Sequence, residues 1–295
     1  MTTTVASTTQ RGRDAKDSAP LSTAEAQGGG RELTETFQRT VAEGEHRLTR
    51  SWPQLLATGV VGGLDVGVGI LGLLLVREAT GSELLAGLAF GIGFIALTLA
   101  QSELFTENFL VPVVAVTAKR ASVLKLLRLW FGTALMNLAG GWVITGLIMA
   151  GLPKLRPTAV EIATEYARLP ASRAFALAIL GGLVITLMTW MERATESVPA
   201  KLVAAISAAF LLVAGTLNHA IVVSLLSFAA LHAGAPFGYG HWLAVAGLAT
   251  VGNIIGGIGL VTVLRLVQVG RERIEEAQEE GQESELTIVT SRSIT

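Results

Sequence analysis

The sequence predicts an all-α membrane protein with six transmembrane helices in an inverted 3+3 repeat, whose second and fifth helices are broken. Of the 295 residues, 51% are hydrophobic and only 15% are charged, whereas about a quarter of the residues in soluble domains are charged. The charges gather towards the two ends of the chain, and six long apolar stretches lie between them. The second and fifth stretches are too long for one span and are polar in their middle.

The chain divides into four predicted segments. Residues 1–30 are rich in Thr, Ser, Gly and Ala and are expected to be disordered, without the apolar segment of a cleaved signal peptide. Residues 31–52 carry apolar side chains at roughly helical spacing, which favours an amphipathic helix on the membrane surface or, alternatively, a solvated helical stalk. Residues 53–269 form the six-span transmembrane transport domain. Residues 270–295 form an acidic tail that starts as a helix and then frays.

Four of the six apolar regions have the length of ordinary transmembrane helices. They are residues 54–76, 126–151, 174–191 and 242–269. The first of them is rich in glycine, which allows close helix packing, and it contains Asp65. A carboxylate inside a span faces protein or water rather than lipid, so Asp65 is either a functional group or a structural hydrogen-bond acceptor. A polar loop with several prolines is expected between the third and fourth spans.

The other two regions are overlong. Residues 84–118 would be about 52 Å long as one helix, against a hydrocarbon layer of about 30 Å, and polar residues interrupt them between Gln101 and Asn108. Residues 201–231 are interrupted in the same way at residues 215–219. Backbone outside a helix survives at membrane depth only where protein buries it or where it lines a wet cavity. The sequence therefore predicts a permeation site where two broken helices meet.

The order of the spans predicts the symmetry and the orientation of the chain. The interrupted regions stand at positions two and five, which correspond in two halves of three spans each. Because three is odd, the second half starts from the opposite side of the membrane, as in an inverted repeat. Most Lys and Arg residues of the connections fall on one side when both termini are cytoplasmic, and this favours that orientation.

Composition excludes several classes of function. The chain has no cysteine, so disulfides, thiol catalysis and thiolate metal sites are excluded. A net charge of −1 gives no indication of nucleic-acid binding. No cofactor or metal site is predicted, and the partners expected are a small anion and the lipid bilayer.

His219 is the main candidate for pore chemistry, because it is the one histidine in the middle of a predicted membrane region. An ionisable group there is a functional hypothesis by default, and the alternative is a neutral histidine packed between helices. Thr106 and the backbone around it offer hydrogen-bond donors near the first interruption. Glu103 is expected to cap the half-helix that follows, whereas Glu107 has no predicted partner.

Four apolar residues stand where they would narrow a pore, although plain packing explains apolar residues in membrane helices equally well. They are Phe90, Phe94, Leu104 and Leu212.

Three short motifs resemble one transporter family. Residues 102–108 read Ser-Glu-Leu-Phe-Thr-Glu-Asn, which resembles the G/S-E/D-L-F-T-x-N motif of the formate/nitrite transporters. Residues 253–257, which begin with Asn253, resemble the G-N-x-x-G-G motif of that family, and Asn218-His219 lies at the place of its mid-fifth-span histidine. The resemblance covers roughly residues 35–270.

The resemblance implies an aquaporin-like six-helix protomer that assembles as a homopentamer with one pore per protomer. It implies transport of small monovalent anions such as formate or nitrite, channel-like or coupled to protons. By position, His219 matches the central pore histidine and Thr106 its threonine partner. Phe90 and Leu212 match one constriction, and Leu104 and Phe94 match the other. Asn218 is assigned to the pore, and Glu103, Asn108 and Asn253 support the loop and its packing.

The sequence also departs from the family pattern. Asn218 replaces a usual Glu before the histidine, and Val223 and Gly182 replace polar Asn residues. These changes leave the substrate open between formate or nitrite, another weak acid and a neutral solute.

The resulting hypothesis is a transport protein for a small weak acid or its anion. The alternative is an aquaporin-like channel for water or a small neutral solute, which the lack of an Asn-Pro-Ala motif disfavours. An intramembrane hydrolase would need HExxH, GxSxG or paired Asp motifs, and none occurs.

Overall fold

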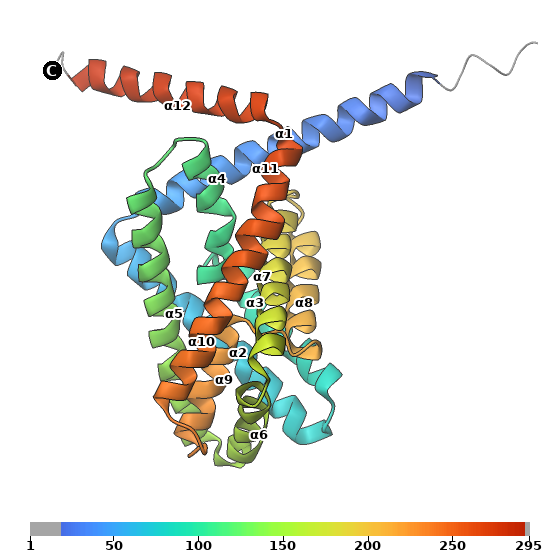
Figure 1. Cartoon of the computed structure of the whole chain (residues 1–295), viewed down its shortest axis with the longest axis vertical. Helices are drawn as coiled ribbons and strands as arrows, with labels where there is room; N and C mark the ends of the chain where they lie inside the picture. The colour runs from blue at the N-terminus through green and yellow to red at the C-terminus, as the bar shows by residue number, and fades with distance from the viewer. Residues whose placement is uncertain (1–18, 293–295) are drawn as a thin grey trace, which may run out of the picture.

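The computed structural model describes residues 19–292, with side chains described for residues 30–282. All the regular elements in this part of the chain are helices, and most of them run side by side in one bundle (Figure 1). Three of the predicted spans are single α-helices: α2 (Trp52–Thr80), α5 (Val123–Gly151) and α7 (Ala171–Arg193). Each is long and apolar enough to cross a membrane.

The second and fifth spans are broken, as the sequence predicts. In the second, α3 (Glu83–Ala100) is followed by residues 101–104, the 3₁₀ helix η1 (Phe105–Phe109) and the short helix α4 (Val111–Thr117). In the fifth, α8 (Val198–Ala214) and α9 (Ala220–His232) are separated by residues 215–219. We call residues 101–104 break 1 and residues 215–219 break 2. The predicted all-α architecture with two broken helices is confirmed.

The sixth span contains a stretch of unusual helix. It runs through α10 (Tyr239–Ile254), the π-helix η3 (Ile255–Thr262) and α11 (Val263–Val269). The Thr262 hydroxyl donates to the carbonyl oxygen of Phe109 at 2.8 Å and to that of Gly257, five residues earlier, at 3.1 Å. The π-helix therefore contacts the segment that follows break 1.

Helices α1 (Ala19–Thr49) and α12 (Arg271–Arg292) lie together at one end of the bundle, which we call the α1 end (Figure 1). Arg273 donates to the Gly30 carbonyl oxygen at 2.7 Å. Helix α1 begins at Ala19 instead of residue 31, because residues 19–27 are mostly good helix formers. Its apolar residues Phe37 and Val41 are buried against other helices of the chain, including α4.

The opposite end carries a helix where the sequence analysis expects a polar loop. Residues 152–170 contain the one-turn η2 (Pro153–Leu155) and the helix α6 (Arg156–Ala167). Pro157, one of the prolines of the expected loop, stands in the first turn of α6, where proline is compatible with a helix. Ala159 and Tyr166 of α6 are buried in the apolar core of the bundle.

Candidate functional site

Break 1 is held open by one asparagine of α5. The Asn137 side-chain amide donates to the carbonyl oxygens of Gly59, at 2.8 Å, and Glu103, at 2.9 Å. Its oxygen accepts from the backbone N–H of Phe105 at 2.8 Å. Asn137 is fully buried, so it satisfies backbone groups that water cannot reach.

Break 2 is held by Asn253 of α10 in the same manner. The Asn253 amide donates to the carbonyl oxygens of Ala178, at 2.7 Å, and Asn218, at 3.0 Å. Its oxygen accepts from the backbone N–H of Ala220 at 2.9 Å. Asn137 thus joins break 1 to α2, and Asn253 joins break 2 to α7. We call these two side chains the asparagine clamps.

The two halves share local patterns as well as the order of their spans. Residues 137–141 and 253–257 both read N-x-x-G-G. A Cβ atom added at Gly63 would overlap the Asn137 carbonyl oxygen, and one at Gly182 would overlap that of Asn253. The close helix crossing that glycine permits therefore recurs in both halves.

His219 of break 2 meets Thr106 of η1 at the centre of this arrangement. The Thr106 Oγ1 and His219 Nε2 atoms are 2.7 Å apart, and both residues are fully buried. The backbone N–H of Val222 donates to His219 Nδ1 at 3.3 Å. Because Nδ1 accepts, Nε2 carries the proton of the neutral imidazole and donates to Thr106. The Thr106 hydroxyl hydrogen is then free to donate to a third group.

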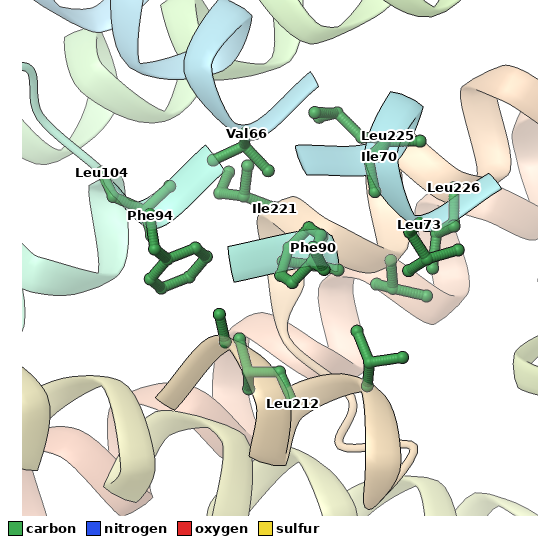
Figure 2. Packing of buried hydrophobic residues seen from close by; sticks show 14 of the residues in the cluster. Val66, Ile70, Leu73, Phe90, Phe94, Leu104, Leu212, Ile221, Leu225 and Leu226 are labelled. Carbon is green, nitrogen blue, oxygen red and sulfur yellow. The ribbon is translucent and has the colours of Figure 1, made fainter. Parts of the chain in front are cut away.

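The four predicted constriction residues, Phe90, Phe94, Leu104 and Leu212, are almost completely buried. They belong to one apolar cluster that also contains Ile221, from the first turn of α9 (Figure 2). The rings of Phe90 and Phe94 lie 5.5 Å apart between centroids. This cluster surrounds the polar breaks with apolar side chains.

The Asn218 side chain, predicted to take part in the pore, contacts α7. Its side-chain amide donates to the Ala174 carbonyl oxygen of α7 at 3.3 Å, and its side-chain oxygen is buried without a hydrogen-bond partner in the described part of the chain. The Asn218 carbonyl oxygen accepts a hydrogen bond from the Asn253 side-chain amide.

The acidic residues in and after break 1 pair with Arg47, which lies in α1, and with Arg50, which lies just after the end of α1. The expectation that Glu103 caps a half-helix is wrong: Leu104 is the N-cap residue of η1, without a side-chain cap bond. The Glu103 carboxylate instead pairs with Arg50 and lies 3.4 Å from Arg47. A buried carboxylate such as that of Glu103 is stabilised better by two guanidinium groups than by free backbone N–H donors.

Arg47 lies at the centre of this ion cluster, and only 5% of its surface is exposed. It donates to Glu43 at 2.8 Å and to the Asn108 side-chain oxygen at 3.1 Å, and it lies 3.5 Å from Glu107. Burial alone lowers the pKa of Arg47, but Glu103, Glu107 and Glu43 raise it above its usual value. Arg47 therefore stays cationic and ties α1 to η1.

A cavity of about 220 Å³ opens at the α1 end beside this cluster. Its lining reaches break 1 at Gln101 and Ser102. The charged side chains around it include both signs: Glu43, Arg47, Arg50, Glu107, Arg193 and Lys201. A much smaller cavity, about 20 Å³, lies beside break 2 at Thr216 and is lined by Arg77, Glu83 and Glu165. A charged cavity thus borders break 1, and a much smaller one with a mostly apolar lining borders break 2.

Two residues of the site are absent from the sequence-based candidates. Asn137 is one of them, although its N-x-x-G-G pattern repeats that of residues 253–257. Arg47 lies in a segment expected on the membrane surface, and no sequence pattern indicates its burial. Among the described residues, no group of three or more His, Asp or Glu side chains is arranged to hold a metal ion.

A family comparison agrees with this geometry. The model of the family described as "Formate/nitrite transporter" matches residues 34–267. The chain belongs to the formate/nitrite transporter family. Its members are transporters rather than enzymes, and the chain is a multi-pass membrane protein.

Curated relatives of this formate/nitrite transporter have low identity but long coverage. The chain is 30% identical to the inner membrane protein YfdC of Escherichia coli, over 82% of each chain. It is 25% identical to the formate channel BtFdhC of Bacillus thuringiensis, over 75% of this chain and 89% of the relative.

Solved structures share the fold. An FNT family ion channel superposes with a TM-score of 0.71 at 22% identity and covers 78% of this chain and 97% of its own. A pentameric formate channel with formate bound gives a TM-score of 0.58 at 20% identity, over 72% and 95% of the two chains.

Proposed function

We propose that this transporter moves small monovalent anions or their weak acids, such as formate or nitrite, through a pore in each protomer. The observation that carries the proposal is the hydrogen bond between Thr106 and His219, because it joins break 2 to η1, the helix that directly follows break 1, inside the bundle. Polar groups of this kind inside a membrane domain favour a substrate path.

The donors around this pair suit an anion. Helix α9 begins directly after His219, and the first turn of a helix has N–H groups without partners inside the helix. The Ala220 and Val222 N–H groups already bind Asn253 and the His219 ring, so it is the positive end of the helix dipole that attracts negative charge here. The free hydroxyl hydrogen of Thr106 adds a side-chain donor.

The apolar cluster and the histidine have complementary roles in the proposed mechanism. Phe90, Phe94, Leu104 and Leu212 strip water from the substrate and disfavour a bare charge. His219 then stabilises the anion by a hydrogen bond or, after it has taken up a proton from water to become imidazolium, passes that proton to the anion and returns to the neutral imidazole. Asn253 and Asn108 support the breaks, and Asn218 keeps break 2 against α7.

Relatives support the substrate class and the assembly. BtFdhC is named a formate channel, and one similar structure is a pentameric formate channel with formate bound. We infer that this chain forms a homopentamer in a prokaryotic cytoplasmic membrane, with the α1 end, and hence both termini, in the cytoplasm. The positive-inside pattern of the loops supports this orientation.

A substrate panel in proteoliposomes tests the proposal. Formate, nitrite, acetate, lactate and hydrosulfide are offered across a range of external pH, and empty liposomes serve as the control. Saturable uptake of one of them supports the proposal. Osmotic water flow above that of empty liposomes, with no uptake of any anion, would instead favour the aquaporin-like alternative.

A further inference from the structure

Glu192 is a buried carboxyl group that the ion cluster around Arg47 leaves unpaired. It lies in the last turn of α7 and is only 6% exposed. Among the described residues it takes part in no ion pair. A buried carboxylate without a cationic partner is costly, whereas a neutral carboxylic acid avoids most of that cost. Glu192 is therefore a group whose charge needs an explanation.

The hydroxyl of Thr98, in α3, is the hydrogen-bonding partner of Glu192 in the described part of the chain. Thr98 Oγ1 lies 3.0 Å from Glu192 Oε1 and 2.8 Å from the carbonyl oxygen of Phe94, one turn earlier. The hydroxyl has one hydrogen for these two contacts. When it donates to Phe94, the contact with Glu192 is a hydrogen bond only if the carboxyl group carries a proton. When Glu192 is a carboxylate, the hydroxyl can turn and donate to it, so the contact suits reversible proton binding.

Glu192 borders two cavities at the α1 end. One is the cavity of about 220 Å³ that reaches break 1, which we call the inner cavity. The other, of about 410 Å³, we call the outer cavity, and its lining includes the exposed Glu196. Thr98 lines the inner cavity, and Phe94, a proposed constriction residue, lies one turn further along α3. A solute that enters from the α1 end therefore passes Glu192 before it reaches the constriction.

Charged side chains of both signs line these cavities. The cations are Arg39, Arg47, Arg50, Arg193 and Lys201. The other titratable groups are Glu43 and His46 of α1, Glu107 of η1 and Glu196. Glu43 and Glu107 face Arg47, and Glu196 faces Arg39.

Two of the cations have no counter-charge of their own. Arg193 and Lys201 line both cavities together with Glu192, and among the described residues neither forms an ion pair. A Glu192 carboxylate repels an anion that approaches them. Protonation of Glu192 removes that repulsion and leaves the two positive charges to attract the anion.

We propose that Glu192 binds a proton reversibly and that this proton lets a substrate anion bind beside it, at Arg193 and Lys201. The inference rests on the proposed function and adds a loading step to the same pore. A hydronium ion gives its proton to a Glu192 oxygen and leaves as water, and the reverse step restores the carboxylate. Proton binding and anion binding then strengthen each other by the same factor. The proton comes from solution at the α1 end, so a pH change on the opposite side of the membrane does not reach Glu192.

Infrared spectroscopy of the reconstituted full chain tests the proton site. A protonated carboxyl group has a C=O band that carboxylates and imidazoles lack. Spectra are recorded with and without formate at pH values between about 5 and 8, a range in which exposed carboxyl groups stay charged. We expect the band to grow in acid and on formate addition in the wild type, and to be lost in Glu192→Gln. Glu196→Gln is the matched control and should keep the band, because the Glu196 side chain is 85% exposed.

Two infrared results would overturn the assignment. Identical bands in the wild type and Glu192→Gln would show that Glu192 binds no proton in this range. A band lost in Glu107→Gln but kept in Glu192→Gln would place the proton on Glu107. Glu192→Asp covers the case in which Glu192→Gln does not fold: it keeps a carboxyl group and should move the band, and an unmoved band would contradict the inference.

Formate uptake by membrane vesicles of known orientation tests the effect of the proton on transport. In vesicles that expose the α1 end, which are inverted ones under the proposed orientation, Glu192 meets the external solution. There we expect the KM of the wild type at about pH 8 to exceed that of Glu192→Gln by about threefold or more, because the carboxylate repels the anion. The two KM values should converge as the pH falls, and Glu196→Gln should follow the wild type. Equal KM values at every pH would contradict the inference.

The two measurements separate this inference from the proposed function. Wild-type uptake without an infrared band that depends on Glu192 refutes the inference alone. The band without uptake of any anion refutes the proposed function alone.

Discussion

Break 1 and break 2 have the same backbone but carry different side chains. Leu104 and His219 occupy equivalent places, with φ and ψ of −97° and 133° in Leu104 and −93° and 125° in His219. Each follows a residue whose carbonyl oxygen binds a clamp asparagine. The equivalent position is therefore apolar in one break and titratable in the other.

The residue before each of these positions differs as well. Glu103 of break 1 pairs with Arg47 and Arg50, whereas Asn218 of break 2 makes one long hydrogen bond to α7. Break 1 is thus anchored by charge to α1, while break 2 carries a buried imidazole that contacts Thr106. The comparison teaches that equivalent backbone positions in the two repeat units carry an anchored segment in one and, in the other, the titratable side chain to which we assign pore chemistry.

The anchoring of break 1 by Arg47 should have the largest effect on stability. Arg47→Met leaves the carboxylates of Glu103 and Glu107 buried with fewer partners, so we expect a loss of about 3–5 kcal/mol, measured by thermal unfolding in detergent. Arg39→Met is the matched control, because Arg39 forms an exposed ion pair with Glu35 on the same helix and should cost about 0.5 kcal/mol or less. Similar losses in the two variants would show that break 1 is not anchored by charge.

If the two breaks are built in the same way, removing either asparagine clamp should lower the stability of the fold by the same amount. Asn137→Ala and Asn253→Ala each remove three buried hydrogen bonds, so each should cost about 3 kcal/mol. Unfolding midpoints of the two variants check this equality. A large loss for one clamp and none for the other would break the comparison.

A substitution of Asn218 distinguishes the pore role expected from the sequence from a packing role through its hydrogen bond to α7. Asn218→Ala loses a single 3.3 Å bond, so we expect a stability loss of about 1 kcal/mol and formate uptake within about twofold of the wild type. Uptake reduced by about tenfold or more, with the fold intact, would restore the pore assignment.

The smallest expected effect concerns Glu43, at the rim of the ion cluster. Burial raises its pKa, but Arg47, Arg193 and Arg50 together lower it below the usual value of 4.5. A lowered pKa in the folded state means that Glu43 stabilises the fold above about pH 4.5 and that this contribution disappears as pH falls further. Unfolding temperatures of the wild type and Glu43→Gln should therefore differ slightly at neutral pH and converge in acid. A difference that grows in acid would contradict the assignment.

Much of the fold is predictable from the sequence because span length and polarity are local properties. The polar interruptions at residues 101–108 and 215–219 are visible in the sequence and coincide with the breaks. The π-helix η3 is not predictable in this way, because its hydrogen-bond pattern depends on Thr262 reaching Phe109, which is distant in sequence.

The site is less accessible to sequence reasoning than the fold. His219 and Thr106 are identifiable as polar residues inside spans, and the structure brings them together, although their role in transport stays a prediction. Asn137 is also a polar residue in a span, but only the contacts show which backbone groups it binds. An arginine in a charged terminal segment normally remains solvated, so Arg47 is recognisable as buried only once α1 is placed.

Formate uptake by His219→Leu in proteoliposomes tests the central claim most directly. The substitution gives break 2 the residue that break 1 has, and the unfolding temperature of the variant checks that the fold is retained. We predict that uptake falls by about tenfold or more, because a buried anion loses a polar partner worth about 1.5–3 kcal/mol, and that the remaining flux loses its pH dependence. Wild-type uptake with a wild-type pH profile in the folded variant would contradict the account.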